Sequence, residues 1–229
     1  MAFAAGVLVA TALADLLPEA SGLIGGTNPA VPGTAALVGF LAFSAIEAFV
    51  HRQTWEHQHN RSASELDPDL PHEHAESFTL GRRGALGFVG PASLIVHSTL
   101  DGLAIGLAFR ADAGVGLLVA VAVLAHDFAD GMNVVTLSLA AGQRSGLAGG
   151  LLVVDALAPV LGAAIGSFAD LQPEVLGYLL AVFAGVFLAV GAGHLLPEAE
   201  HHRPGASPVL VLLTAVGAGV VVTIRSVLG

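Results

Sequence analysis

The sequence predicts an all-helical protein, a polytopic bundle of transmembrane helices. Its 229 residues are 55% hydrophobic and only 11% charged, and the mean hydropathy is +0.80. A soluble domain carries about 25% charged residues. The charges are also clustered, which leaves uncharged runs long enough to cross a bilayer as helices, whereas the short alternating segments of a transmembrane β-barrel are absent. We therefore expect a single transmembrane domain over residues 1–229.

Turn-forming residues separate the expected spans. Stretches containing glycine and proline follow the first span at 25–29 and the sixth at 203–205, and a polar turn follows the fourth at 141–144. We do not expect the first span to be a signal peptide, because no basic residue precedes it and Asp15 interrupts it. The seven expected spans are about 3–23, 33–51, 84–109, 115–140, 146–168, 174–199 and 207–227.

Residues 52–83 form one long polar connection between the second and third spans. This segment mixes histidines and acids with two prolines and offers no apolar face, so we expect a disordered loop. Its composition suits a weak metal-binding segment, and a solvated linker that happens to be rich in histidine is the alternative. The histidines in question are His57, His59, His72 and His74.

Arginine placement predicts the orientation of the bundle. Six of the eight arginines lie on the side of the 52–83 loop, and only Arg110 and Arg225 lie on the other. The positive-inside rule then puts this loop and the amino terminus in the cytoplasm. The chain has no lysine and is rich in alanine and glycine, which suggests a high-GC prokaryote. We expect an integral protein of a prokaryotic plasma (inner) membrane.

Composition also excludes several classes of protein. The chain has no cysteine, so thiolate metal sites and disulfides are impossible. Its formal net charge of −10 argues against a nucleic-acid partner, because phosphates require a basic surface. A seven-helix retinal pigment is ruled out because it needs a lysine for its Schiff base.

Two central spans carry histidine and aspartate in the middle of apolar sequence. His97 and Asp101 are four residues apart, as are His126 and Asp130, so each pair lies on one helix face. Placing an ionisable group at the bilayer centre costs roughly 2.5–3.5 kcal/mol, and such groups usually line a path or bind something. If the two helices face each other, they offer two imidazoles and, with Asp127, three carboxylates. This set suits a divalent cation, and a structural interhelical hydrogen bond is the alternative for either pair alone.

Two further residues could extend this metal site. Ser98 could supply an oxygen ligand next to His97. Asp155 falls near the middle of the next span and is a candidate ligand from a third helix. Pro159, four residues later, is expected to kink that helix and to free a backbone carbonyl.

A short segment recurs in opposite halves of the chain. Asp-Leu-Leu-Pro-Glu-Ala at 15–20 returns as His-Leu-Leu-Pro-Glu-Ala at 194–199. Because the first span runs outward and the sixth runs inward, this recurrence indicates an inverted repeat, which is typical of secondary transporters. We expect its acids and histidines to line the entry and exit of a path, with interfacial helix caps as the alternative. These residues, with two histidines that follow, are Asp15, Glu19, His194, Glu198, His201 and His202.

These motifs resemble those of the ZIP (Zrt/Irt-like) family of divalent metal transporters. Residues 97–106 and 126–131 are similar to its His-Asn-x-Pro-Glu-Gly and His-x-x-Pro-Glu motifs, and the repeated segment and the His-rich loop extend the resemblance over nearly the whole chain. The resemblance implies an eight-helix fold, often dimeric, that moves metal into the cytoplasm. It also implies a binuclear metal site between the family's fourth and fifth helices. The family's first helix has no counterpart in this chain. The implied ligands are His97, Asp101, His126 and Asp130, with Ser98 and Asp127 at the adjoining metal position.

The chain also departs from the family pattern. Aspartates replace the motif glutamates at 101 and 130, Ser98 replaces an amide, and both motif prolines are missing. Ala158 stands where the family's sixth helix usually has glutamate, and Asp155, one turn earlier, is the candidate substitute. These departures leave both one and two bound metal ions open.

The sequence therefore predicts a transporter of divalent metal, not an enzyme, with zinc as the expected substrate and iron, manganese or cobalt as alternatives. One rival is an intramembrane zinc-dependent lipid hydrolase with Asp127 as its base. Another is a proton-coupled permease for an organic solute, in which His97 and His126 titrate. Metal preference, coupling ion, channel or carrier mechanism and oligomeric state stay open.

Overall fold

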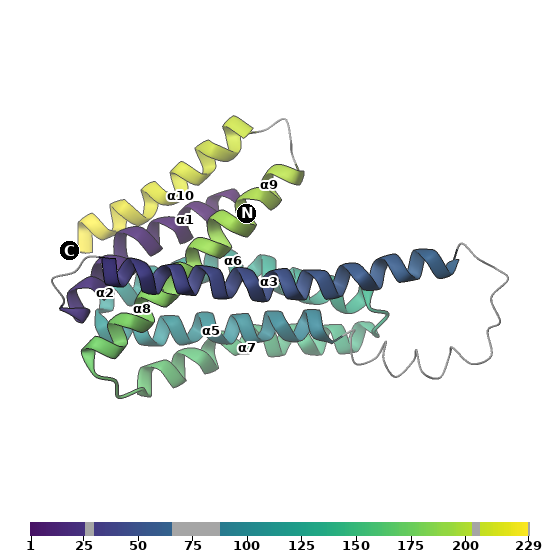
Figure 1. Ribbon diagram of the computed structural model, residues 1–229, viewed down its shortest axis with the longest axis horizontal. Coiled ribbons are helices and arrows are strands. Elements are labelled where there is room, and N and C mark those ends of the chain that lie inside the picture. The colour runs from purple at the N-terminus through teal and green to yellow at the C-terminus, as the bar shows by residue number, and fades with distance from the viewer. Residues whose placement is uncertain (26–29, 66–87, 203–206, 229) are drawn as a thin grey trace.

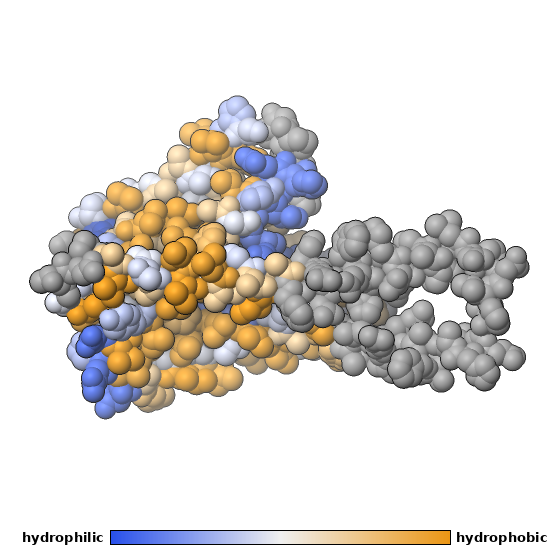
Figure 2. Space-filling view, in the orientation of Figure 1, coloured by the Kyte–Doolittle hydropathy of each residue, from blue (hydrophilic) through white to orange (hydrophobic). Residues whose placement is uncertain are grey.

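The computed structural model describes residues 1–25, 30–65, 88–202 and 207–228, and these residues are almost entirely helical, as predicted. Figure 2 shows hydrophobic residues over the body of the bundle and hydrophilic residues gathered toward its ends, as expected for a membrane protein. Within the described residues, seven helical stretches are long and apolar enough to cross a membrane. They are Ala2–Ile24, Ala30–Ala48, Val89–Ala111, Ala113–Ala140, Ser145–Phe168, Pro173–His201 and Ser207–Val227.

Two of these spans are interrupted by short π-helical segments. The first span consists of α1 (Ala2–Thr11), η1 (Ala12–Leu16) and α2 (Leu17–Ile24), and the sixth of α8 (Pro173–Leu188), η2 (Ala189–Leu195) and α9 (Leu196–His202). The other spans lie in α3 (Ala30–Glu65), α5 (Val89–Ala111), α6 (Ala113–Ala140), α7 (Ser145–Phe168) and α10 (Ser207–Leu228). We call the end of the bundle near residues 89, 140 and 202 the loop end, and the end near residues 24, 111 and 168 the far end.

The structure corrects the expected start of the polar loop. Helix α3 does not end at the membrane edge but continues to Glu65, so the first part of the segment expected to be disordered is helical. This extension contains no glycine or proline, and lengthening an existing helix is much easier than starting a new one. Of the loop histidines, His57 and His59 lie on the helical extension, and His72 and His74 lie outside the described residues, as does all of 66–87.

The helices pack in two groups. Helices α5, α6 and α7 pack mainly on one another, while α1 packs along α10 and α3 along α8 (Figure 1). Glycines allow an especially close approach of α5 and α7. A Cβ atom added at Gly102 would lie 2.0 Å from the carbonyl oxygen of Pro159, and one added at Gly162 would lie 2.1 Å from that of Thr99. This backbone contact, typical of small residues in membrane helices, holds α7 against the part of α5 that carries the predicted ligands.

The two recurring segments have the same local structure. Both π-helical segments lead directly into a helix that begins Leu-Pro-Glu-Ala, and the first and sixth spans run in opposite directions through the bundle (Figure 1). Proline accounts for the wider turns, because Pro18 and Pro197 cannot donate the usual hydrogen bond to the carbonyl one turn earlier. The arrangement agrees with the predicted inverted repeat.

Candidate metal site

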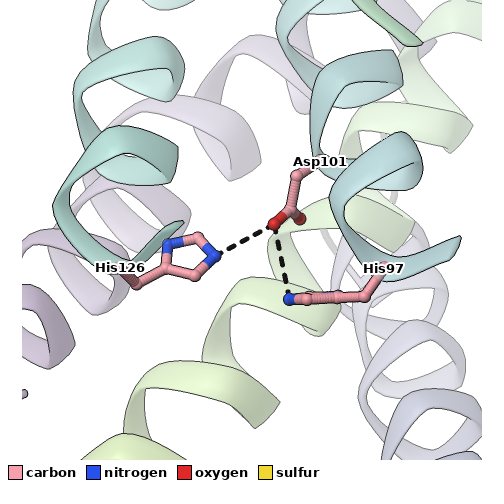
Figure 3. A group of neighbouring side chains, drawn as sticks. All are labelled: His97, Asp101 and His126. Atoms are coloured by element: carbon pink, nitrogen blue, oxygen red, sulfur yellow. Dashed lines mark hydrogen bonds and ion pairs between the residues drawn. The ribbon is translucent and has the colours of Figure 1, made fainter. Parts of the chain in front are cut away.

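Four predicted ligands meet between α5 and α6. The Asp101 Oδ2 atom lies 2.9 Å from His126 Nε2 and 3.3 Å from His97 Nε2. The Asp130 Oδ2 atom lies 3.7 Å from each of the same two nitrogens. Figure 3 shows both imidazoles turned toward the Asp101 carboxylate. Ligand atoms around a tetrahedral zinc ion lie about 3.3 Å apart, so these separations fit one bound ion.

Helix spacing and packing produce this convergence. Each helix places its His and Asp one turn apart on the same face, and α5 and α6 pack against each other. The ligand atoms of His97, Asp101 and His126 all lie within 4.8 Å of one another. Asp101 and His126 are each only 2% exposed, so water cannot replace the interactions that these groups make.

The site concentrates negative charge in an apolar bundle. Besides the two aspartates of the cluster, Asp127 and Asp155 lie close enough to interact electrostatically with Asp101. Taking carboxylates out of water is unfavourable unless a cation compensates them. The arrangement therefore favours a bound divalent cation.

The contact that His126 Nδ1 makes fixes the tautomer of the imidazole ring. His126 Nδ1 lies 3.0 Å from the carbonyl oxygen of Ala122, and that carbonyl can only accept, so Nδ1 carries the proton. In a neutral ring, Nε2 is then an acceptor that faces an acceptor, Asp101 Oδ2. Two acceptors this close require a proton or a metal ion between them. His126 is thus oriented as a metal ligand would be.

Ser98 and Asp155 lie beside the four-ligand cluster. The Ser98 hydroxyl donates a 2.8 Å hydrogen bond to Asp155 Oδ1, and both residues are 1% exposed. This bond joins α5 to α7 next to the close contact at Gly102. Asp127 is half-buried on α6 and interacts electrostatically with Asp155. The structure thus places these three residues around the cluster without giving any of them a direct contact to its histidine nitrogens among the described residues.

Two of the predicted path residues make side-chain contacts with partners of the opposite kind, one toward each end of the bundle. Toward the far end, the fully buried Asp15 contacts Arg225, and toward the loop end His194 contacts Glu47. His194 also interacts electrostatically with Asp130 of the cluster. A role of any of these residues in a path stays a prediction. The remaining path residues include the half-buried Glu19 and Glu198 and the exposed His201, and the side chain of His202 lies outside the described residues.

Sequence reasoning missed three partners of these groups. Phe43 of α3 packs its ring on His97, with ring centroids 5.2 Å apart. Glu47 and Arg225 are the partners of the two path residues above. The face that each of these helices turns toward its neighbours depends on tertiary packing, so no local pattern predicted these three contacts.

Residues 52–225 match the family model described as ZIP zinc transporter. The chain belongs to the ZIP family. Over 138 residues it is 29% identical to the zinc transporter ZIP6 of Pongo abelii and to that of Homo sapiens. The matched region covers 58% of this chain, 19% of the Pongo abelii protein and 18% of the Homo sapiens protein. The match thus spans about a fifth of the length of these relatives.

Membership in the ZIP family confirms the resemblance drawn from the motifs. ZIP proteins are transporters and not enzymes, which argues against the intramembrane lipid hydrolase. The part of the chain that the structure describes holds seven helices that could cross a bilayer, so this ZIP protein is an integral membrane protein.

Proposed function

We propose that this protein transports divalent metal ions, with zinc as its main substrate, through the His97, Asp101, His126 and Asp130 cluster. The observation that carries the proposal is the convergence of two imidazole nitrogens and two carboxylate oxygens inside an apolar bundle. A mixed nitrogen and oxygen set suits zinc, and it also suits iron(II), manganese or cobalt.

The depth of the cluster supports transport. Asp101 lies halfway along α5 and His126 halfway along α6. Both helices are long enough to cross a membrane, so their middles fall near the bilayer midplane, where transporters hold their substrates. A metal ion bound there would lie near the middle of the bilayer.

Import is the proposed direction, as the resemblance to the ZIP family implies, and the orientation of the bundle sets the end from which the metal leaves. The arginine asymmetry puts the loop end in the cytoplasm, so import means movement from the far end to the loop end. Metal would enter near Asp15 and Glu19 and leave past a group of residues at the loop end. That group comprises His194, Glu198, His201 and His202, with His57, His59, His72 and His74 of the loop segment as a metal sink.

The setting of the protein is part of the same proposal. We place it in the plasma (inner) membrane of a prokaryote, in contact with the lipid bilayer, with a homodimer as its assembly. Its partners are then divalent metal ions and lipid, and no nucleic acid.

Uptake by purified protein tests the proposal. Zinc, iron and manganese accumulation is measured in proteoliposomes that contain the intact chain or the Asp130→Ala variant. Asp170→Ala is the matched control, because Asp170 is a fully exposed aspartate whose contact, at 3.8 Å, is with Arg110 at the far end. We expect saturable zinc uptake by the intact chain and the control, and its loss in Asp130→Ala. Normal uptake by Asp130→Ala would show that the site is misassigned.

A further inference from the structure

The two histidines of the cluster are held in different ways. His126 is fixed at both nitrogens, because Nδ1 contacts the Ala122 carbonyl and Nε2 contacts Asp101. His97 contacts acids through Nε2, but its Nδ1 atom is buried and has no hydrogen-bond partner among the described residues. Metal-ligating histidines normally have their second nitrogen hydrogen-bonded, and this bond fixes the orientation of the ring. His97 lacks that restraint.

An aromatic ring takes the place of the missing hydrogen bond. Phe43 packs on the His97 imidazole with centroids 5.2 Å apart and planes inclined by 48°, an arrangement within the favourable range for aromatic pairs. Phe43 belongs to α3, which packs mainly along α8, whereas His97 belongs to the group formed by α5, α6 and α7. The contact therefore crosses between the two packing groups.

This contact lies on the side of the cluster that faces the loop end. His97 is one turn closer to the loop end than Asp101 on α5, and Glu47 follows Phe43 by one turn along α3 in the same direction. Glu47 contacts His194, which in turn interacts electrostatically with Asp130. The Phe43 and His97 rings therefore lie on the side of the cluster toward which a metal ion leaving for Glu47 and His194 would move.

We propose that His97 is the exchangeable ligand of the cluster and that Phe43 is the positioning residue that holds it in the ligating orientation. Rotation of the His97 ring away from Phe43 breaks one metal bond while His126 keeps the ion in place. Phe43 thus sets the rate at which metal leaves toward the loop end. This inference rests on the proposed metal site but not on transport itself.

The test measures metal release from the intact chain. Purified protein is loaded with Co²⁺, whose absorption reports its ligand geometry, and release is followed after mixing with excess chelator. Phe43→Leu keeps an apolar side chain but removes the ring, and we expect release to accelerate about 2- to 10-fold. Phe43→Tyr keeps the ring and should retain the slow rate. Phe40→Leu is the matched control, because Phe40 is one turn earlier on α3, where that helix meets α8 at Gly185, and it should leave the rate unchanged.

A second background separates positioning from general packing. If Phe43 acts through His97, then Phe43→Leu should not accelerate release further in a chain that already carries His97→Ala. Equal acceleration with and without His97, or an unchanged rate in Phe43→Leu, would overturn the inference.

The outcome is distinguishable from failure of the proposed function. A chain that takes up no metal, yet releases Co²⁺ at a rate set by Phe43 through His97, refutes transport and leaves this inference standing. A chain that binds neither Co²⁺ nor Zn²⁺ refutes both.

Discussion

The contact between α5 and α7 gives the sharpest prediction about structure. Gly102 follows the ligand Asp101 directly, and a Cβ atom at this position would lie 2.0 Å from the carbonyl oxygen of Pro159. Real Cβ atoms do not approach other atoms within 3.0 Å, so Gly102→Ala forces the two helices apart by about 1 Å or more. The obstacle is backbone, which cannot rotate away as a side chain could.

The loss of stability in Gly102→Ala is calculated from the interactions that this separation breaks. Overpacking of a tight interface costs about 1–3 kcal/mol. The 2.8 Å hydrogen bond from Ser98 to Asp155 spans the same interface, and 1 Å of added separation lengthens it beyond hydrogen-bonding distance. Leaving the buried Asp155 carboxylate without this donor costs about another 1–3 kcal/mol. We therefore expect a total loss of about 2–6 kcal/mol, which is about 4–24 °C in Tm for a chain of this size.

Thermal unfolding in detergent measures the effect. Gly149→Ala is the matched control, because Gly149 lies in α7 and has no atom within 4 Å of its added Cβ. Alanine there should be neutral or slightly stabilising, since it favours the helix over glycine. If Gly102→Ala proves as stable as Gly149→Ala, the close packing of α5 on α7 is wrong.

Three further predictions concern the metal site and its supports. Zinc at about 100 times its Kd should stabilise the intact chain by about 2.7 kcal/mol and so raise its Tm. The same zinc concentration should leave the Tm of His126→Ala unchanged, and an equal rise of Tm in both chains would show that zinc binds elsewhere. Arg225→Gln should lower the free energy of unfolding by about 1–3 kcal/mol, because it leaves the buried Asp15 without its cation. Arg110→Gln breaks an exposed pair and should cost less than about 1 kcal/mol, and chemical denaturation measures both variants. Ser98→Ala should destabilise the protein by about 1–3 kcal/mol, and an unchanged midpoint would show that the hydrogen bond to α7 is unimportant.

The sequence predicted the membrane spans well because hydropathy is a local signal. Each apolar run is bounded by turn residues or charges, and the structure places the seven spans within a few residues of the predicted ranges. The start of the polar loop was predicted wrongly because polar composition was taken to mean disorder. The residues that follow the second span contain no helix breaker, so α3 simply continues to Glu65.

The cluster was accessible to sequence reasoning because its key distances are set within single helices. Spacing of four residues puts His97 over Asp101 and His126 over Asp130, and only the facing of two consecutive helices had to be assumed. Which second partner each histidine finds could not be predicted in this way. Phe43 meets His97 through the packing of α3, which lies mainly along α8, and no periodicity encodes that contact.

The most direct test of the account measures bound zinc and zinc uptake in the same preparation. Asp101 receives both imidazole contacts, so Asp101→Asn removes the charge at the centre of the cluster with little change in shape. We predict that the intact chain and Asp170→Asn bind zinc and accumulate it in proteoliposomes, whereas Asp101→Asn loses both activities together. Zinc uptake that persists in Asp101→Asn at the rate of the intact chain would contradict it.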